Sequence, residues 1–158
     1  MKIPDSVKRA NEIDEPIVRT VFQLNGIPCK TGTFNDDWKH IDLIIEYKEN
    51  DFKVDVKRNN KTQLSSRNFT FTFKNNKGEI FPFSDKAYFA FIDDVEYLIY
   101  LIRQDKIKKL VDTSKQFLSK YDNSKYILIS KEWTKKNANR ILVIDDFSKK
   151  HMQLTKNL

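Results

Sequence analysis

Two aspartates and one lysine are the residues of this chain whose types and spacing best suit chemistry. Asp55 and Lys57 lie two positions apart in the stretch FKVDVK, and Asp42 lies in the apolar stretch HIDLII. Because side chains alternate along a strand, we expect Asp55 and Lys57 to point to the same face. Two carboxylates are enough to hold a hard divalent cation, and an ammonium beside them donates a proton or stabilises negative charge. The residue types therefore indicate a metal site, provided that Asp42 lies close to the other two.

The positions of these residues depend on two predicted strands, residues 41–47 and 51–57, joined by a polar turn at residues 48–50. Antiparallel pairing sets the start of the first strand against the end of the second, so Asp42 is expected beside Asp55. The exposed face of an ordinary hairpin also carries alternating charges, and spacing alone leaves that alternative open. Aspartate is depleted in strands and common at turns, yet neither aspartate lies at a turn.

Further helices and strands surround this hairpin. Helical periodicity predicts a two-piece helix over residues 5–25, with Pro16 in the first turn of its second piece. Alternating or apolar runs predict strands at residues 69–73, 87–93, 97–102, 126–130 and 141–144. Residues 105–118 read as a helix, while 27–37 read as an irregular or edge strand, 58–68 and 131–140 as polar loops, and 149–158 as a frayed tail. This order is typical of a single α/β or α+β domain over residues 1–158, with a central mixed sheet flanked by helices.

Composition limits the class of protein. The chain has 158 residues, a net charge of +7 and a single cysteine, Cys29. A basic surface suits phosphate backbones, although a lysine- and asparagine-rich composition also follows from an AT-rich genome. One cysteine allows no internal disulfide and suits a reducing cytosol, and no apolar run is long enough for a membrane span. We therefore expect a cytoplasmic protein that does not insert into membranes.

The sequence resembles the PD-(D/E)xK nuclease superfamily. The resemblance is carried by an early helix with a glutamate, then I-D-L-I-I, V-D-V-K, a polar loop with serines and arginine, F-T-F-T-F and Y-F-A-F-I-D-D-V-E-Y-L-I-Y-L-I. It covers residues 15–118 and is closest to the small Holliday-junction-resolvase-like and intron-encoded homing endonuclease members. It implies a restriction-endonuclease-like core with the element order αβββαβ.

The resemblance also implies roles for particular residues. Asp42 corresponds to the first metal ligand of the family, and Asp55 to the second. Lys57 corresponds to the lysine that orients the attacking water or offsets charge on the scissile phosphate. Glu15 stands where many relatives have a helical glutamate at the metal site, but Pro16 places it at the helix start, where complementing the helix dipole is an equal alternative. The implied cofactor is Mg²⁺, with Mn²⁺ as a substitute.

Polar and basic residues in two segments are candidates for DNA contacts. The first set follows the second strand of the hairpin: Arg58, Lys61, Gln63, Ser65, Ser66 and Arg67. The second set lies near the C-terminal end: Lys131, Trp133, Lys135, Lys136 and Arg140. An ordinary solvated loop is the alternative for the first set, and for Trp133 the alternatives are stacking on a base and covering the core.

The function expected from these residues is metal-dependent hydrolysis of DNA phosphodiester bonds. A small domain that cuts both strands implies a homodimer, because each active site serves one strand. Neither nucleotide-binding motif, G-x-x-x-x-G-K-[ST] or G-x-G-x-x-G, occurs, so no nucleotide cofactor is expected. Two alternatives remain. One is an inactive nuclease fold, from a mobile element or phage, that binds DNA or blocks a partner; the other is an interaction protein whose charge is only compositional.

Overall fold

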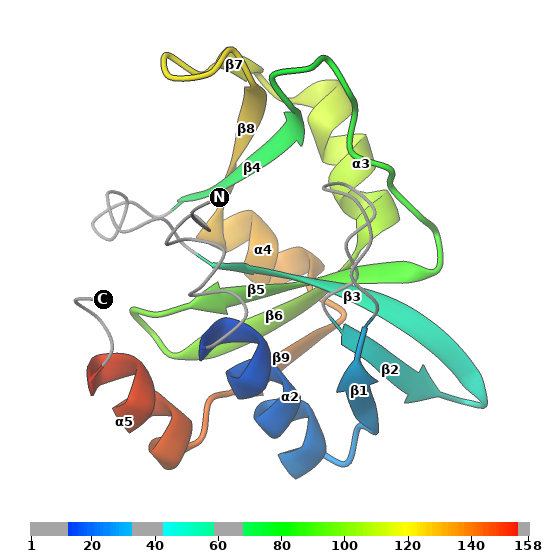
Figure 1. Ribbon diagram of the computed structural model, residues 1–158, viewed down its shortest axis with the longest axis vertical. Coiled ribbons are helices and arrows are strands. Elements are labelled where there is room, and N and C mark those ends of the chain that lie inside the picture. The colour runs from blue at the N-terminus through cyan, green and yellow to red at the C-terminus, as the bar shows by residue number, and fades with distance from the viewer. Residues whose placement is uncertain (1–12, 33–42, 59–67, 155–158) are drawn as a thin grey trace, which may run out of the picture.

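The computed structural model describes residues 13–32, 43–58 and 68–154, and the account below concerns these residues alone (Figure 1). A six-stranded sheet has the order β1-β2-β3-β5-β6-β9, and a three-stranded sheet has the order β4-β8-β7. The larger sheet contains β1 (Cys29–Thr31), β2 (Leu43–Tyr47), β3 (Asn50–Arg58), β5 (Ala87–Asp93), β6 (Leu98–Arg103) and β9 (Arg140–Val143). The smaller contains β4 (Asn68–Lys74), β7 (Phe117–Leu118) and β8 (Lys125–Ser130). The helices are α2 (Glu15–Leu24), α3 (Gln104–Thr113), α4 (Lys131–Asn137) and α5 (Asp146–Leu154).

The larger sheet is mixed. Strands β3 and β5 run parallel, whereas the other neighbours are antiparallel. The predicted hairpin is present as β2 and β3, and Tyr47 pairs with Asn50 across a two-residue turn. Both turn residues, Lys48 and Glu49, have positive φ values of 49° and 68°, which matches the twist of a two-residue hairpin turn. The mixed α+β class expected from the sequence is therefore confirmed.

Each face of the larger sheet is covered by a different kind of core. Helices α2 and α5 lie along one face (Figure 1), where Val18, Val54 and Ile99 belong to an aliphatic core. The three-stranded sheet, α3 and α4 lie on the other side, where the core is largely aromatic. There Phe69 of β4 and Phe91 of β5 have ring centroids 5.2 Å apart. The sheet is thus buried on both faces, which explains the continuous apolar run of β5.

The predicted strands agree with the described ones to within one residue at each described end, and three other predicted segments differ. The helix expected over residues 105–118 ends at Thr113, because Ser114 is extended, and Phe117 then joins β7 and stacks on Tyr126 at 5.4 Å. The expected loop 131–140 is wrong for most of its length, since Ser130 caps α4 by accepting a hydrogen bond from the Trp133 backbone N–H.

The third difference lies at the C-terminal end. Residues expected as a frayed tail continue α5 as far as Leu154, because Met152 is buried in the aliphatic core. The predicted order αβββαβ places a helix between the third and fourth predicted strands, residues 69–73 and 87–93, but residues 75–86 between β4 and β5 form no helix. The restriction-endonuclease-like core therefore stays a prediction. None of the described helices combines the length and apolar composition required to cross a bilayer.

Candidate active site

The end of β3 carries the charged residues that the sequence singled out. Val54 and Val56 are buried in the aliphatic core, so the intervening Asp55 and the following Lys57 project from the opposite face of the sheet. The Lys57 Nζ lies 3.5 Å from Asp55 Oδ1. The Asp55 side chain is 14% exposed and that of Lys57 is 37% exposed. The two predicted residues therefore form one ion pair, and its lysine is the more exposed partner.

An aromatic ring supports the lysine. The Lys57 ammonium lies 5.8 Å from the centre of the Phe81 ring, and Phe81 itself is buried in the aromatic core. A cation near a ring face is attracted by the negative charge of that face. Phe81 and Asp55 together define where the ammonium sits at the end of the strand.

The hairpin register determines what lies opposite Asp55. The last described pair of the β2–β3 ladder is Leu43↔Val54. Asp42 precedes Leu43 and lies outside the described residues, as do five residues of the predicted DNA-contacting loop: Lys61, Gln63, Ser65, Ser66 and Arg67. Their predicted roles stay predictions.

Arg58 lies in a different environment from its neighbour Lys57. It was expected in the DNA-contacting loop, but it is the last residue of β3, and its side chain is only 6% exposed. Its guanidinium donates to Asp14 Oδ1 at 3.0 Å and to Asp94 Oδ2 at 3.3 Å. These contacts tie the start of α2 and the end of β5 to β3. Arg58 is therefore positioned to stabilise the fold rather than to contact phosphate.

A second buried ion pair joins β5 to α4. Lys131 Nζ lies 3.1 Å from the fully buried carboxylate of Asp93, which also accepts hydrogen bonds from the backbone N–H groups of Val95 and Glu96. Burial alone raises the pKa of Asp93, but these N–H groups and the ammonium outweigh it and hold that pKa below its ordinary value. The pKa of Tyr100 is raised mainly by burial, and further by the negative charges of Asp93 and Glu96. The Tyr100 hydroxyl lies 3.5 Å from both carboxylates.

Glu15, the fourth predicted catalytic residue, is half-buried in the first turn of α2, directly before Pro16. Helix α2 packs on the aliphatic face, whereas Asp55 and Lys57 project from the other face. It is the preceding residue, Asp14, that meets the end of β3 through Arg58. Metal binding by Glu15 therefore stays a prediction.

The second set of predicted DNA-contacting residues lies on and beside α4. Trp133 is half-buried against the aromatic core, which favours its covering role. Lys131 is held by Asp93, and the exposed Lys135 lies 3.0 Å from Glu96. Lys136 and Arg140 are exposed, and thus form the basic surface that this segment presents to solvent.

The described residues also bear on whether this chain binds a metal or uses a reactive thiol. Within residues 13–32, 43–58 and 68–154, no three histidine, cysteine or acidic residues lie close enough together to hold a metal ion. Asp55 supplies one carboxylate at the predicted site. Burial raises the pKa of Cys29 to about 11, with a smaller opposing effect of Arg19, so its thiol stays protonated at neutral pH.

The buried charges around Arg58 and Lys131 were missed at the level of sequence. Asp93 was predicted only as the last residue of a strand and Asp94 was given no role, although two successive aspartates at the end of an apolar strand are a signal of buried ionic contacts. No protein-family model, curated protein or solved structure matches the chain.

Proposed function

We propose that this protein is a metal-dependent endonuclease that hydrolyses DNA phosphodiester bonds, with its active site at the end of β3. The observation that carries the proposal is the pair Asp55 and Lys57, which share one face of the sheet with 3.5 Å between carboxylate and ammonium. Arg58, the next residue, and Lys131 are buried against carboxylates. The Lys57 ammonium, by contrast, remains partly exposed.

The proposed cation is Mg²⁺, or Mn²⁺ in its place, held by Asp55 and Asp42. Continuing the β2–β3 ladder by one pair beyond Leu43↔Val54 predicts Asp42 opposite Asp55. Directly opposed residues of an antiparallel pair have Cβ atoms about 5 Å apart, a span that suits two carboxylates with one cation between them. Carboxylate oxygens are the ligands that Mg²⁺ prefers, and it keeps several waters beside them. When bound, the cation would polarise a water and offset charge on the phosphate.

Side chains of the protein itself would stabilise the charge on the phosphate and attract the DNA. The Lys57 ammonium offers positive charge where the phosphoryl oxygens gain negative charge, an effect that is strongest when the donor is already in position. Asp55 and the Phe81 ring provide that positioning. The net charge of +7 attracts the DNA backbone and speeds encounter at low salt. Cutting both strands of a duplex would require two copies of the chain, one for each strand.

The direct test is cleavage of plasmid and branched DNA in the presence of Mg²⁺ by wild type and by Asp55→Asn, which keeps the shape of the side chain and removes its charge. We expect cleavage to fall by about two orders of magnitude or more, as when one charge-stabilising group is lost. Asp51→Asn is the matched control, because Asp51 lies on the same strand and face but is exposed and 3.8 Å from Lys30. Equal cleavage by wild type and Asp55→Asn would contradict the proposal.

A further inference from the structure

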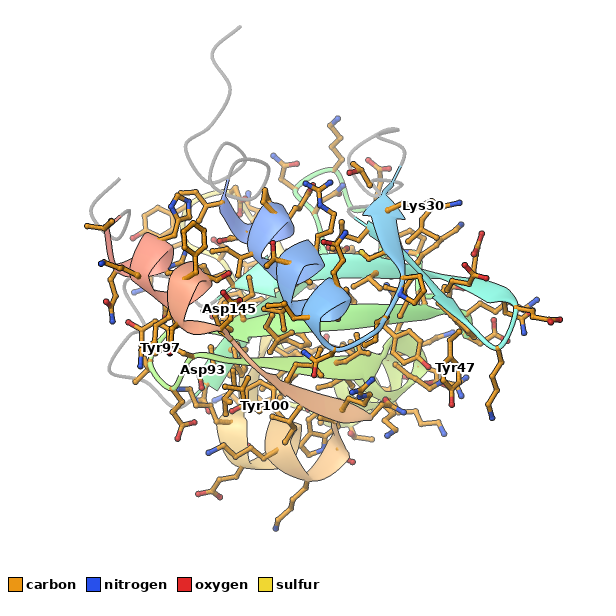
Figure 2. All side chains as sticks on the ribbon, turned by 90° about the horizontal axis from the view of Figure 1, so that it is seen from below. Lys30, Tyr47, Asp93, Tyr97, Tyr100 and Asp145 are labelled. Atoms are coloured by element: carbon orange, nitrogen blue, oxygen red, sulfur yellow. The ribbon has the colours of Figure 1, made fainter. Side chains whose placement is uncertain are left out.

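The two edges of the six-stranded sheet are built differently. At one edge β1 has three residues, follows Pro28 and carries an exposed lysine, Lys30. Short length, proline and lysine are the usual devices that keep an edge strand from pairing with another chain. At the other edge β9 has the sequence Arg-Ile-Leu-Val, followed by Ile144, and has neither proline nor lysine. Figure 2 shows β9 along the near side of the sheet, between α5 and α4.

The backbone of β9 has one side paired and one side unpaired by any described strand. The Ile144 N–H donates to the Tyr97 carbonyl, which continues the antiparallel ladder with β6. Because residues of such a ladder alternate in the direction of their N–H and C=O groups, Leu142 shares the direction of Ile144. Ile141 and Val143 therefore direct their backbone groups away from β6. No described strand pairs with the two donors and two acceptors of these residues, which can bind water or another strand.

The side chains of the same two residues are exposed and apolar. Ile141 is 45% exposed and Val143 is 71% exposed, whereas the alternate residues Leu142 and Ile144 are buried in the aliphatic core. Both exposed residues are β-branched and well suited to a strand. An edge strand without proline or lysine whose exposed side chains are apolar and β-branched is a template for pairing with another strand.

Charges at the two ends of β9 favour a second copy of this chain as the occupant. Arg140 begins the strand, and Asp145 and Asp146 follow its end. Arg140 and Asp146 are both exposed. An antiparallel pair of identical strands places the start of each beside the end of the other, so the basic end of one copy meets the acidic end of its partner. This arrangement is self-complementary, as a two-fold interface requires.

We propose that two copies of the chain pair through β9 in antiparallel orientation, with the two-fold axis at Leu142. In this register Ile141 lies opposite the partner's Val143, and the outward N–H and C=O groups of both residues form the ladder. Arg140 lies opposite the partner's Ile144, which precedes the partner's Asp146 by two residues, so a long arginine side chain can approach that carboxylate. The two six-stranded sheets join into one continuous sheet. This interface refines the homodimer part of the proposed function, but the features of β9 do not depend on nuclease activity.

The first test measures the mass of the full-length protein in solution, without DNA or metal. Wild type is expected at about twice the 18.8 kDa of one chain, and Val143→Lys at the mass of one chain. A lysine at this position places two like charges at the centre of the interface, yet it fits an exposed site of the monomer. The matched control is Ile80→Lys, because Ile80 is also β-branched, is 64% exposed and lies outside the larger sheet. It should remain dimeric.

Hydrogen exchange of wild type tests the register without any substitution. The amides of Ile141 and Val143 should exchange slowly in the dimer and at least about tenfold faster on dilution to the monomer. The amide of Leu142, which faces β6, should change little. Exchange of Ile141 and Val143 at the fast rate at all concentrations would overturn the proposal.

Charge reversal tests the orientation of the pair. Arg140→Asp should raise the dimer dissociation constant by at least about tenfold, because it faces like charges across the interface. Arg140→Asp combined with Asp146→Arg should restore most of the affinity. A monomeric wild type, or a Val143→Lys variant that is as dimeric as wild type, would also overturn the interface. Each of these results leaves the Asp55→Asn cleavage test unaffected, so the two proposals fail separately.

Discussion

The end of β3 shows two ways in which a sheet can hold a positive charge. Arg58 points to the aliphatic face, where the carboxylates of Asp14, just before α2, and Asp94, just after β5, enclose its guanidinium. Lys57, the preceding residue, points to the other face, where its ammonium is 3.5 Å from Asp55 and partly exposed. Because the two residues are adjacent in sequence, their difference comes from the alternation of the strand and from what each face offers. The buried Arg58 guanidinium is suited to stabilising the fold, and the partly exposed Lys57 ammonium to acting on a substrate.

Burial determines how much each cation contributes to folding. Removing one partner of a buried ion pair leaves an uncompensated charge away from water and costs several kcal/mol. An exposed pair contributes about 0–1 kcal/mol, because solvent screens it and ordering the side chains costs entropy. We therefore expect substitutions of Arg58 and Lys131 to lower the free energy of unfolding, and substitutions of Lys57 to change it little.

The largest effect is expected for Arg58→Met. Methionine preserves much of the side-chain volume but removes the guanidinium from the buried carboxylates of Asp14 and Asp94. The free energy of unfolding should fall by about 3–5 kcal/mol. Urea denaturation followed by far-ultraviolet circular dichroism measures this loss. A change below about 1 kcal/mol would mean that the two carboxylates reach water or another cation, and the distinction between enclosed and open charges would fail.

A smaller loss is expected for Lys131→Met, about 2–3 kcal/mol, because Asp93 keeps two backbone N–H donors after the ammonium is removed. Lys135→Met is the matched control on the same helix, since the Lys135–Glu96 pair is exposed. That control should change the free energy of unfolding by less than about 1 kcal/mol. Similar losses in both variants would show that burial does not separate the two lysines.

Acidification probes the same pair without a substitution. The pKa of Asp93 is lowered in the folded protein from the ordinary value of 3.8, so the unfolded chain binds more protons in acid than the folded one. Its contribution to stability is complete above pH 3.8 and is lost as the pH falls through the lowered pKa. The loss of stability on acidification should therefore be shallower in Lys131→Met, where the ammonium no longer lowers this pKa. Identical acid profiles for both proteins would contradict the assignment.

The sequence predicted the hairpin because its signals are local. Alternation in FKVDVK fixed the common face of Asp55 and Lys57, and the apolar run of β5 fixed its bounds. The enclosed charges could not be predicted in this way. Arg58 meets Asp14 and Asp94 across 44 and 36 positions of the chain. The parallel pairing of β3 with β5 brings Arg58 to Asp94, and the packing of α2 on the sheet brings Asp14 to Arg58. Helix α4 was predicted as a loop because its segment is rich in lysine. Ser130 was a local N-cap signal that could have found it, whereas the contact of Trp133 with the aromatic core depends on tertiary packing.

The smallest change in stability is expected at the proposed active site. Lys57→Met removes a partly exposed ammonium and keeps an apolar stem beside Phe81, so the free energy of unfolding should change by less than about 1 kcal/mol. If Lys57 stabilises charge on the scissile phosphate, cleavage in Mg²⁺ should nevertheless fall by about two orders of magnitude. Lys57→Arg keeps the charge and should restore part of the activity, although its flat guanidinium cannot occupy the ammonium position fully. A large loss of stability with unchanged cleavage would show that Lys57, like Arg58, stabilises the fold and takes no part in cleavage.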